Sequence, residues 1–170
     1  PLNWRLTVPE LEYILKDSAP KLLISDVKFS LEANELTALC GIELELQLDV
    51  EDANCSYAAT MVSADADYAM VECTHDDVAM IMYTSGTTGH PKGAMITFGM
   101  NFYNAVNLGL PAGVSSDAVQ LVVLPLFHTG GMNCYANPIL HAGGRILLMR
   151  DFEPGRALSV IGDPALGVTH

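Results

Sequence analysis

The chain has 170 residues and a mass of 18.2 kDa, long enough to bury a hydrophobic core without disulfides or a structural metal. Half of its residues are hydrophobic and 16% are charged, which excludes a disordered or fibrous protein. Twenty acidic residues against eight basic ones give a net charge of −12, which argues against nucleic acid and anionic membranes as partners.

Two further features concern the location of the protein. No apolar run reaches the roughly 18 to 20 residues that a membrane span requires, so we expect no transmembrane segment. The four cysteines show no Cys-x-x-Cys spacing, which favours reduced thiols over a zinc or redox site. Together these features predict a cytoplasmic protein.

The first part of the chain predicts the order helix, strand, helix, strand. Thr7 and Glu10 have the spacing of a capping box, so a helix is expected to begin after Thr7. Residues 21–25 and 42–46 predict strands, and residues 30–40 predict a helix. The inward face of the first helix is expected to hold Leu11, Ile14 and Leu15, with Tyr13 as a further candidate.

Residues 49–77 are rich in acidic and small side chains and lack periodicity. They predict a solvated connection that divides the chain into an α/β segment of residues 1–76 and a second of residues 77–170.

The second segment alternates short apolar runs with helical patterns. Such alternation predicts an α/β fold with a largely parallel sheet, flanking helices and ligands at the carboxyl ends of the strands. The expected strands are residues 78–83, 93–97, 120–125 and 145–149, and the expected helices are 99–108, 131–142 with an interruption at Pro138, and 154–161.

The loop after the strand of residues 78–83 carries the strongest chemical signal. It reads YTSGTTGHPKG over residues 83–93, so hydroxyl side chains, glycines and one lysine crowd together. Glycines let backbone amides approach an oxyanion, and hydroxyl groups add donors. Between Lys28 and Arg145 there are thirteen acidic residues and one basic residue, Lys92. These features favour a phosphate-binding loop.

Two alternatives to a phosphate-binding loop concern the same residues. Glycine, serine, threonine and proline also favour a simple surface turn. A Walker A loop is rejected by the spacing, because Pro91 precedes the lysine and Gly93 follows it.

Residues 83–94, YTSGTTGHPKGA, resemble the phosphate-binding signature of the adenylate-forming (AMP-binding) superfamily, which includes the acyl-coenzyme A synthetases. Residues 1–24 look like the stretch upstream of that loop in fatty-acyl-coenzyme A synthetases. LPLFHTGGMN, residues 124–133, looks like their next motif. The resemblance therefore extends over essentially the whole chain.

The resemblance implies an acid–coenzyme A ligase that joins a carboxylic acid, expected to be a fatty acid, to AMP and then to coenzyme A. ATP, Mg²⁺ and coenzyme A would serve the intact enzyme. Lys92 and His128 would be catalytic, and the acid would approach along residues 128–131. The expected nucleotide-binding residues are Thr84, Ser85, Gly86, Thr87, Thr88, Gly89 and Lys92.

Members of that family run to several hundred residues. The resemblance thus implies an incomplete portion of the large N-terminal domain, inactive alone, without metal ligands of its own and prone to form homo-oligomers. The alternative is a non-catalytic nucleotide-binding or assembly module that keeps the loop as a structural turn.

Overall fold

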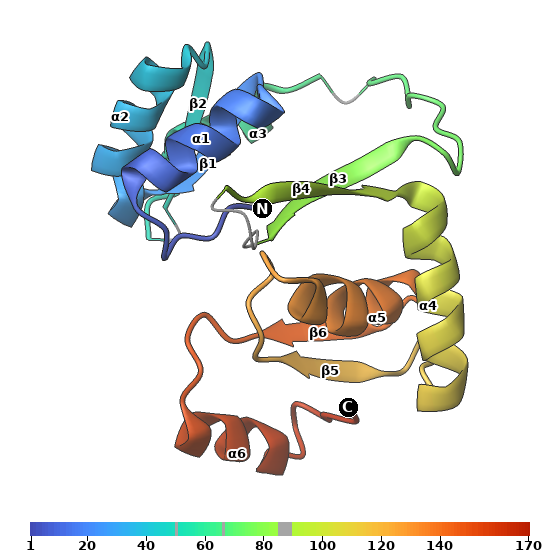
Figure 1. The fold of residues 1–170 in the computed structure, drawn as a ribbon. Helices are drawn as coiled ribbons and strands as arrows, with labels where there is room; N and C mark the ends of the chain where they lie inside the picture. The colour runs from blue at the N-terminus through green and yellow to red at the C-terminus, as the bar shows by residue number, and fades with distance from the viewer. Residues whose placement is uncertain (50, 66, 85–89) are drawn as a thin grey trace. The chain divides into compact units, whose positions relative to one another are not determined.

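The computed structural model describes residues 1–49, 51–65, 67–84 and 90–170. They form two compact units. The amino-terminal unit comprises the described residues of 2–72 and 85–93, and the carboxy-terminal unit comprises residue 1 with residues 73–84 and 94–170. The predicted α/β class is confirmed, and the described strands form three two-stranded sheets, as the ribbon in Figure 1 shows.

Helices and strands alternate in the amino-terminal unit. Its β1 and β2 pair in parallel, with Leu22 opposite Leu44 and Asp26 opposite Leu48, and a helix provides the crossover that parallel strands need. The elements are α1 (Val8–Ser18), β1 (Leu22–Asp26), η1 (Val27–Phe29), α2 (Ser30–Cys40), β2 (Leu44–Leu48) and α3 (Ser56–Ser63).

The core of this unit lies between α1, α2 and β1. The prediction for α1 is confirmed at Leu11, Ile14 and Leu15, which are all buried. It is wrong at Tyr13, whose side chain stays 38% exposed. The buried cluster consists of Leu11, Leu15, Leu23, Ala33, Leu36 and Ile42.

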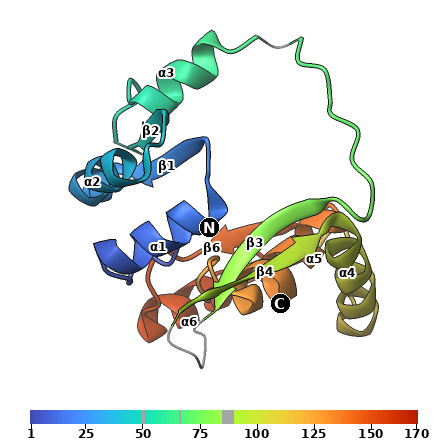
Figure 2. The same cartoon turned by 45° about the horizontal axis from the view of Figure 1, so that its top comes forward.

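The helix α3 corrects the expectation that residues 49–77 form a connection without regular structure. None of the eight residues of α3 is buried, so this helix contributes no buried side chain to the core of the unit. Its N-terminus is held locally, because Ser56 Oγ accepts a hydrogen bond of 2.7 Å from the backbone N–H of Gln47. The described residues that follow α3 run as an extended trace to β3, visible in Figure 2.

The carboxy-terminal unit is built around the parallel pair β5–β6, in which Val119 lies opposite Arg145 and Val122 opposite Leu148. Figure 1 shows α5 against this pair and α4 beside α5. The elements are β3 (Val78–Thr84), β4 (Lys92–Thr97), α4 (Phe98–Ala112), β5 (Val119–Val122), η2 (Gly130–Ala136), α5 (Asn137–His141), β6 (Arg145–Leu148) and α6 (Pro154–Gly162). The first two residues of β4 count with the amino-terminal unit.

The predicted helix of residues 131–142 proves to be two successive helical types. Its first part, η2, is a wide π-helix, and α5 follows without a gap. Pro138 does not interrupt the helix as expected, because it lies in the first turn of α5, where a missing N–H is tolerated.

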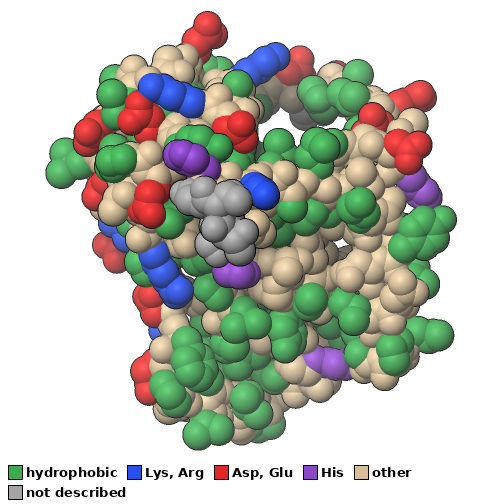
Figure 3. Space-filling view, in the orientation of Figure 1, with side chains coloured by type: hydrophobic (Ala, Val, Ile, Leu, Met, Phe, Trp, Pro, Cys, Tyr) green, Lys and Arg blue, Asp and Glu red, His purple; other side chains and the backbone are tan. Residues whose placement is uncertain are grey.

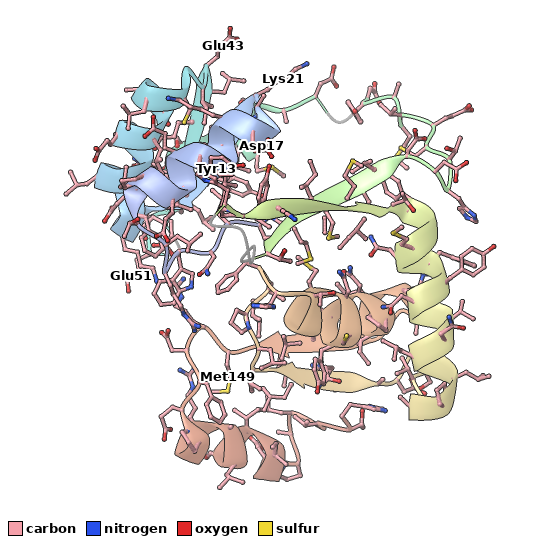
Figure 4. The ribbon with its side chains drawn as sticks, in the orientation of Figure 1. Tyr13, Asp17, Lys21, Glu43, Glu51 and Met149 are labelled. Atoms are coloured by element: carbon pink, nitrogen blue, oxygen red, sulfur yellow. The ribbon has the colours of Figure 1, made fainter. Side chains whose placement is uncertain are left out.

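A smaller hydrophobic cluster joins the last elements. Leu121, Met149 and Ala157 are buried together, and Figure 4 shows Met149 next to α6. On the face drawn in Figure 3, charged side chains gather over the amino-terminal unit, whereas several hydrophobic patches lie on the carboxy-terminal unit. Within the described part of the chain, no helix has both the length and the apolar character that crossing a membrane requires.

We predict that acid weakens α1 through Glu10. Its carboxylate accepts hydrogen bonds from Thr7 Oγ1 (2.7 Å) and from the Thr7 N–H (2.8 Å), and these two bonds hold the pKa of Glu10 below its ordinary value. The carboxylate therefore stabilises the folded state above the ordinary glutamate pKa of about 4.3, and this stabilisation is lost as the pH falls through the lowered pKa.

Thermal unfolding followed by circular dichroism should show a lower Tm for Glu10→Ala than for the wild type at neutral pH, with the two values converging in acid. A difference in Tm that stays constant down to the lowest pH would contradict the assignment to this carboxylate.

Candidate functional site

The ends of β3 and β4 flank the predicted phosphate-binding loop. The apolar run of β3 ends at Thr84, and β4 begins at Lys92; both side chains are exposed. The other predicted loop residues, Ser85, Gly86, Thr87, Thr88 and Gly89, lie outside the described residues. Thr84 and His128 belong to the carboxy-terminal unit and Lys92 to the amino-terminal unit, so the two groups are described separately.

In the amino-terminal unit an aromatic stack lies next to Lys92. The rings of Tyr13 and His90 have centroids 4.8 Å apart and an interplanar angle of 21°. The stack holds His90, and Pro91 restricts the backbone of His90 and its own backbone. Together they limit the directions in which the chain can enter β4 at Lys92. Figure 4 shows Tyr13 on α1. No local pattern in the sequence predicts this role for His90, because the two rings are distant in the chain.

In the carboxy-terminal unit a tight turn carries His128. The backbone N–H of His128 donates to the carbonyl of Pro125 (3.1 Å), and that of Met132 donates to the carbonyl of His128 (3.0 Å). The side chains of His128 and Thr129 are exposed, whereas Gly131 is buried. The turn thus presents an imidazole and a hydroxyl group to solvent.

Gly131 is required by the close approach of this turn to the preceding segment. A Cβ atom at residue 131 would lie 2.4 Å from the carbonyl oxygen of Pro125 and 2.6 Å from that of Leu124. A Cβ at Gly130 would meet only the end of the Leu124 side chain, at 3.3 Å. A side chain is therefore sterically excluded at Gly131 but can be accommodated at Gly130.

Behind the turn, Asn133 forms a buried hydrogen-bond network that no local sequence pattern predicts. Asn133 is only 6% exposed, and its Nδ2 donates to Thr129 Oγ1 (3.2 Å) and to Met82 Sδ (3.5 Å). Asn137 Nδ2 donates to Asn133 Oδ1 (2.9 Å), and Asn104 Nδ2 donates to the Asn133 backbone carbonyl (2.6 Å). This network connects η2 with β3 and α4.

The chemistry available at these positions is that of anion and carboxylate recognition: an ammonium group, hydroxyl groups and an exposed imidazole. In the part of the chain that the structure describes, no three His, Cys, Asp or Glu side chains come together as a metal site.

Residues 1–165 match the AMP-binding enzyme family, so the chain belongs to this family. The family resemblance of the sequence motifs is thereby confirmed. The chain is 38% identical over 161 residues to a feruloyl-CoA synthase of Amycolatopsis, covering 95% of the chain and 30% of that relative. It is 34% identical over 171 residues to an indoleacetate–CoA ligase of Aromatoleum aromaticum, covering 99% of the chain and 34% of the relative.

A solved structure gives the same result for the fold. The ATP-bound crystal structure of MatB from Rhodopseudomonas palustris superposes with a TM-score of 0.80 at 30% identity, covering 95% of this chain and 32% of that one. The chain thus spans about a third of the length of the proteins it matches.

We predict that Gly131→Ala destabilises the protein by about 1 to 3 kcal/mol, because the added methyl group must displace a carbonyl oxygen in a packed turn. Gly130→Ala is the matched control and should cost less, since a leucine side chain can move aside. Urea unfolding curves of the two variants would measure both values. Equal stability of Gly131→Ala and the wild type would refute the close approach.

Proposed function

We propose that the chain is part of an AMP-forming acid–coenzyme A ligase. In the first step a carboxylate oxygen of the acid attacks the α-phosphorus of ATP, and the bond to the bridging oxygen breaks to release pyrophosphate. In the second step the thiol of coenzyme A takes the acyl group, loses its proton and releases AMP. Family membership supports this proposal, as do the names of the two relatives, a CoA synthase and a CoA ligase. The activity is assigned to the complete protein.

The first step needs little acid–base catalysis. A carboxylic acid with a pKa near that of glutamate, about 4.3, is already ionised at neutral pH. The reaction depends on alignment of the attacking oxygen and on stabilisation of the charge that moves onto pyrophosphate.

We assign the stabilisation of the charge on pyrophosphate to the loop between β3 and β4. Lys92 would offset the negative charge of the leaving group, and Mg²⁺ would supply further positive charge when it enters with ATP. The observation that carries the proposal is the position of Lys92, which is exposed at the first residue of β4 and is the one basic residue, against thirteen acidic ones, in the sequence between Lys28 and Arg145. The residues proposed to hold the β- and γ-phosphates are Thr84, Ser85, Gly86, Thr87, Thr88 and Gly89.

We assign the approach of the acid to the turn at His128. Its exposed imidazole, with the hydroxyl group of Thr129, can donate a hydrogen bond to a carboxylate. The substrate proposed is an apolar carboxylic acid. The likeness of residues 1–24 to fatty-acyl-coenzyme A synthetases favours a fatty acid, whereas the relatives named for ferulate and indoleacetate favour an aryl acid.

Lys92→Ala in the complete enzyme should lower kcat/KM for MgATP by about 10- to 150-fold in carboxylate-dependent ATP–pyrophosphate exchange. This range corresponds to the loss of one charge-assisted hydrogen bond of about 1.5 to 3 kcal/mol. Lys21→Ala removes another exposed lysine and is the control. Unchanged exchange in Lys92→Ala would remove Lys92 from the mechanism, and a wild-type enzyme without exchange would favour the non-catalytic module.

A panel of carboxylates in the same assay should separate the substrate classes. If the acid binds in an apolar site, each methylene group added to a fatty acid raises kcat/KM by up to about fourfold until the site is filled. Ferulate and indoleacetate test the aryl class. Equal use of acetate and of long or aromatic acids would contradict an apolar substrate.

A further inference from the structure

We propose that Asn133 is a positioning residue that holds the His128 turn at a fixed place on β3, the strand that leads into the phosphate-binding loop. This inference rests on the proposed function, because it concerns the alignment of acid and ATP in that reaction. It concerns only contacts within the carboxy-terminal unit.

The two N–H groups of one buried amide reach the two functional segments. One bond goes to Thr129, the neighbour of His128, and the other goes to Met82, which lies two residues before Thr84. Met82 is itself buried, with 4% exposure. A displacement of the turn along β3 would leave buried donors without partners, and such unsatisfied groups are strongly disfavoured.

The orientation of the amide is fixed by a third bond. Asn137, one helical turn further on, donates to Asn133 Oδ1 (2.9 Å). The carbonyl side of the amide is thus occupied, and the N–H side faces Thr129 and Met82.

The backbone of Asn133 is held for a separate reason. In the π-helix a carbonyl pairs with the N–H five residues later, as the carbonyl of Met132 does with Asn137. The corresponding partner of Asn133 is Pro138, which has no N–H. Asn104 from α4 supplies the missing donor at 2.6 Å. The wide turn therefore keeps its register at the residue whose side chain contacts β3.

The consequence for catalysis is geometric. Asn133 does not touch a reacting group; it acts through Thr129 and Met82. Its loss should therefore alter the alignment of the acid with the α-phosphorus, to which rates are very sensitive, while the groups that bind the phosphates remain.

The test is ATP–pyrophosphate exchange by the complete enzyme carrying Asn133→Leu, a change of similar size that removes the donors and the acceptor. We expect kcat to fall by about 5- to 100-fold while KM for MgATP stays within about twofold. The control is Gln120→Leu, since Gln120 is a buried amide of the same unit whose side chain donates to the carbonyl of the adjacent Leu121. It should lower Tm without changing kcat.

Two milder variants keep the proposal testable if Asn133→Leu does not fold. Met82→Leu and Thr129→Val each remove one acceptor with little change in shape, and each should lower kcat by about two- to tenfold. In Met82→Leu/Asn133→Leu the loss should not exceed that of Asn133→Leu alone, because the two changes remove the same contact.

Wild-type kcat in both milder variants, or an equal loss of kcat in Gln120→Leu, would overturn the inference and leave the proposed function intact. A wild-type enzyme that shows no carboxylate-dependent exchange would overturn both.

Discussion

The π-helical register of η2 leaves the carbonyl of Asn133 opposite a proline, and the structure must supply a hydrogen-bond donor from elsewhere. Asn104 supplies it, which ties α4 to η2. The side chain of the same asparagine then ties η2 to β3. Because a buried polar group without a partner is costly, these bonds act together and set the position of the turn that carries His128.

The turn adds a second constraint that has no polar component. Gly131 lies so close to the carbonyl oxygens of Leu124 and Pro125 that any side chain at this position would collide with the backbone. A motif that reads as flexible in sequence is therefore tightly packed in the structure. His128 and Thr129 are exposed polar residues of this motif and are the ones we propose to contact the acid.

The distribution of charged residues can be seen in the sequence alone. Acidic residues are spread over the surface of an anionic protein, while a single lysine stands in a loop of small and hydroxyl residues. One basic residue at such a position concentrates positive charge at one point of the sequence, which is the basis for proposing a polyphosphate rather than an extended polyanion as its ligand. Nucleic-acid-binding proteins differ from this chain in that their basic residues form stripes or patches.

Local sequence patterns were sufficient to predict an element wherever the interactions that determine it join residues close in sequence. The spacing of Thr7 and Glu10 correctly located the start of α1, and residues 30–40 were correctly predicted as helix. Prediction failed where burial does not follow local pattern: α3 has no buried face, and Tyr13 lies outside the core although its helix is amphipathic.

The order of residues along the chain was enough to identify the family and the α/β class, and to propose Lys92 as a phosphate-binding residue, because these inferences depend on composition and on neighbours a few positions apart. The stack of Tyr13 on His90, the bond from Asn133 to Met82 and the bond from Asn104 to the Asn133 carbonyl could be known only once the chain was folded. They join residues far apart in sequence, and no periodicity or spacing encodes a contact whose geometry arises from packing.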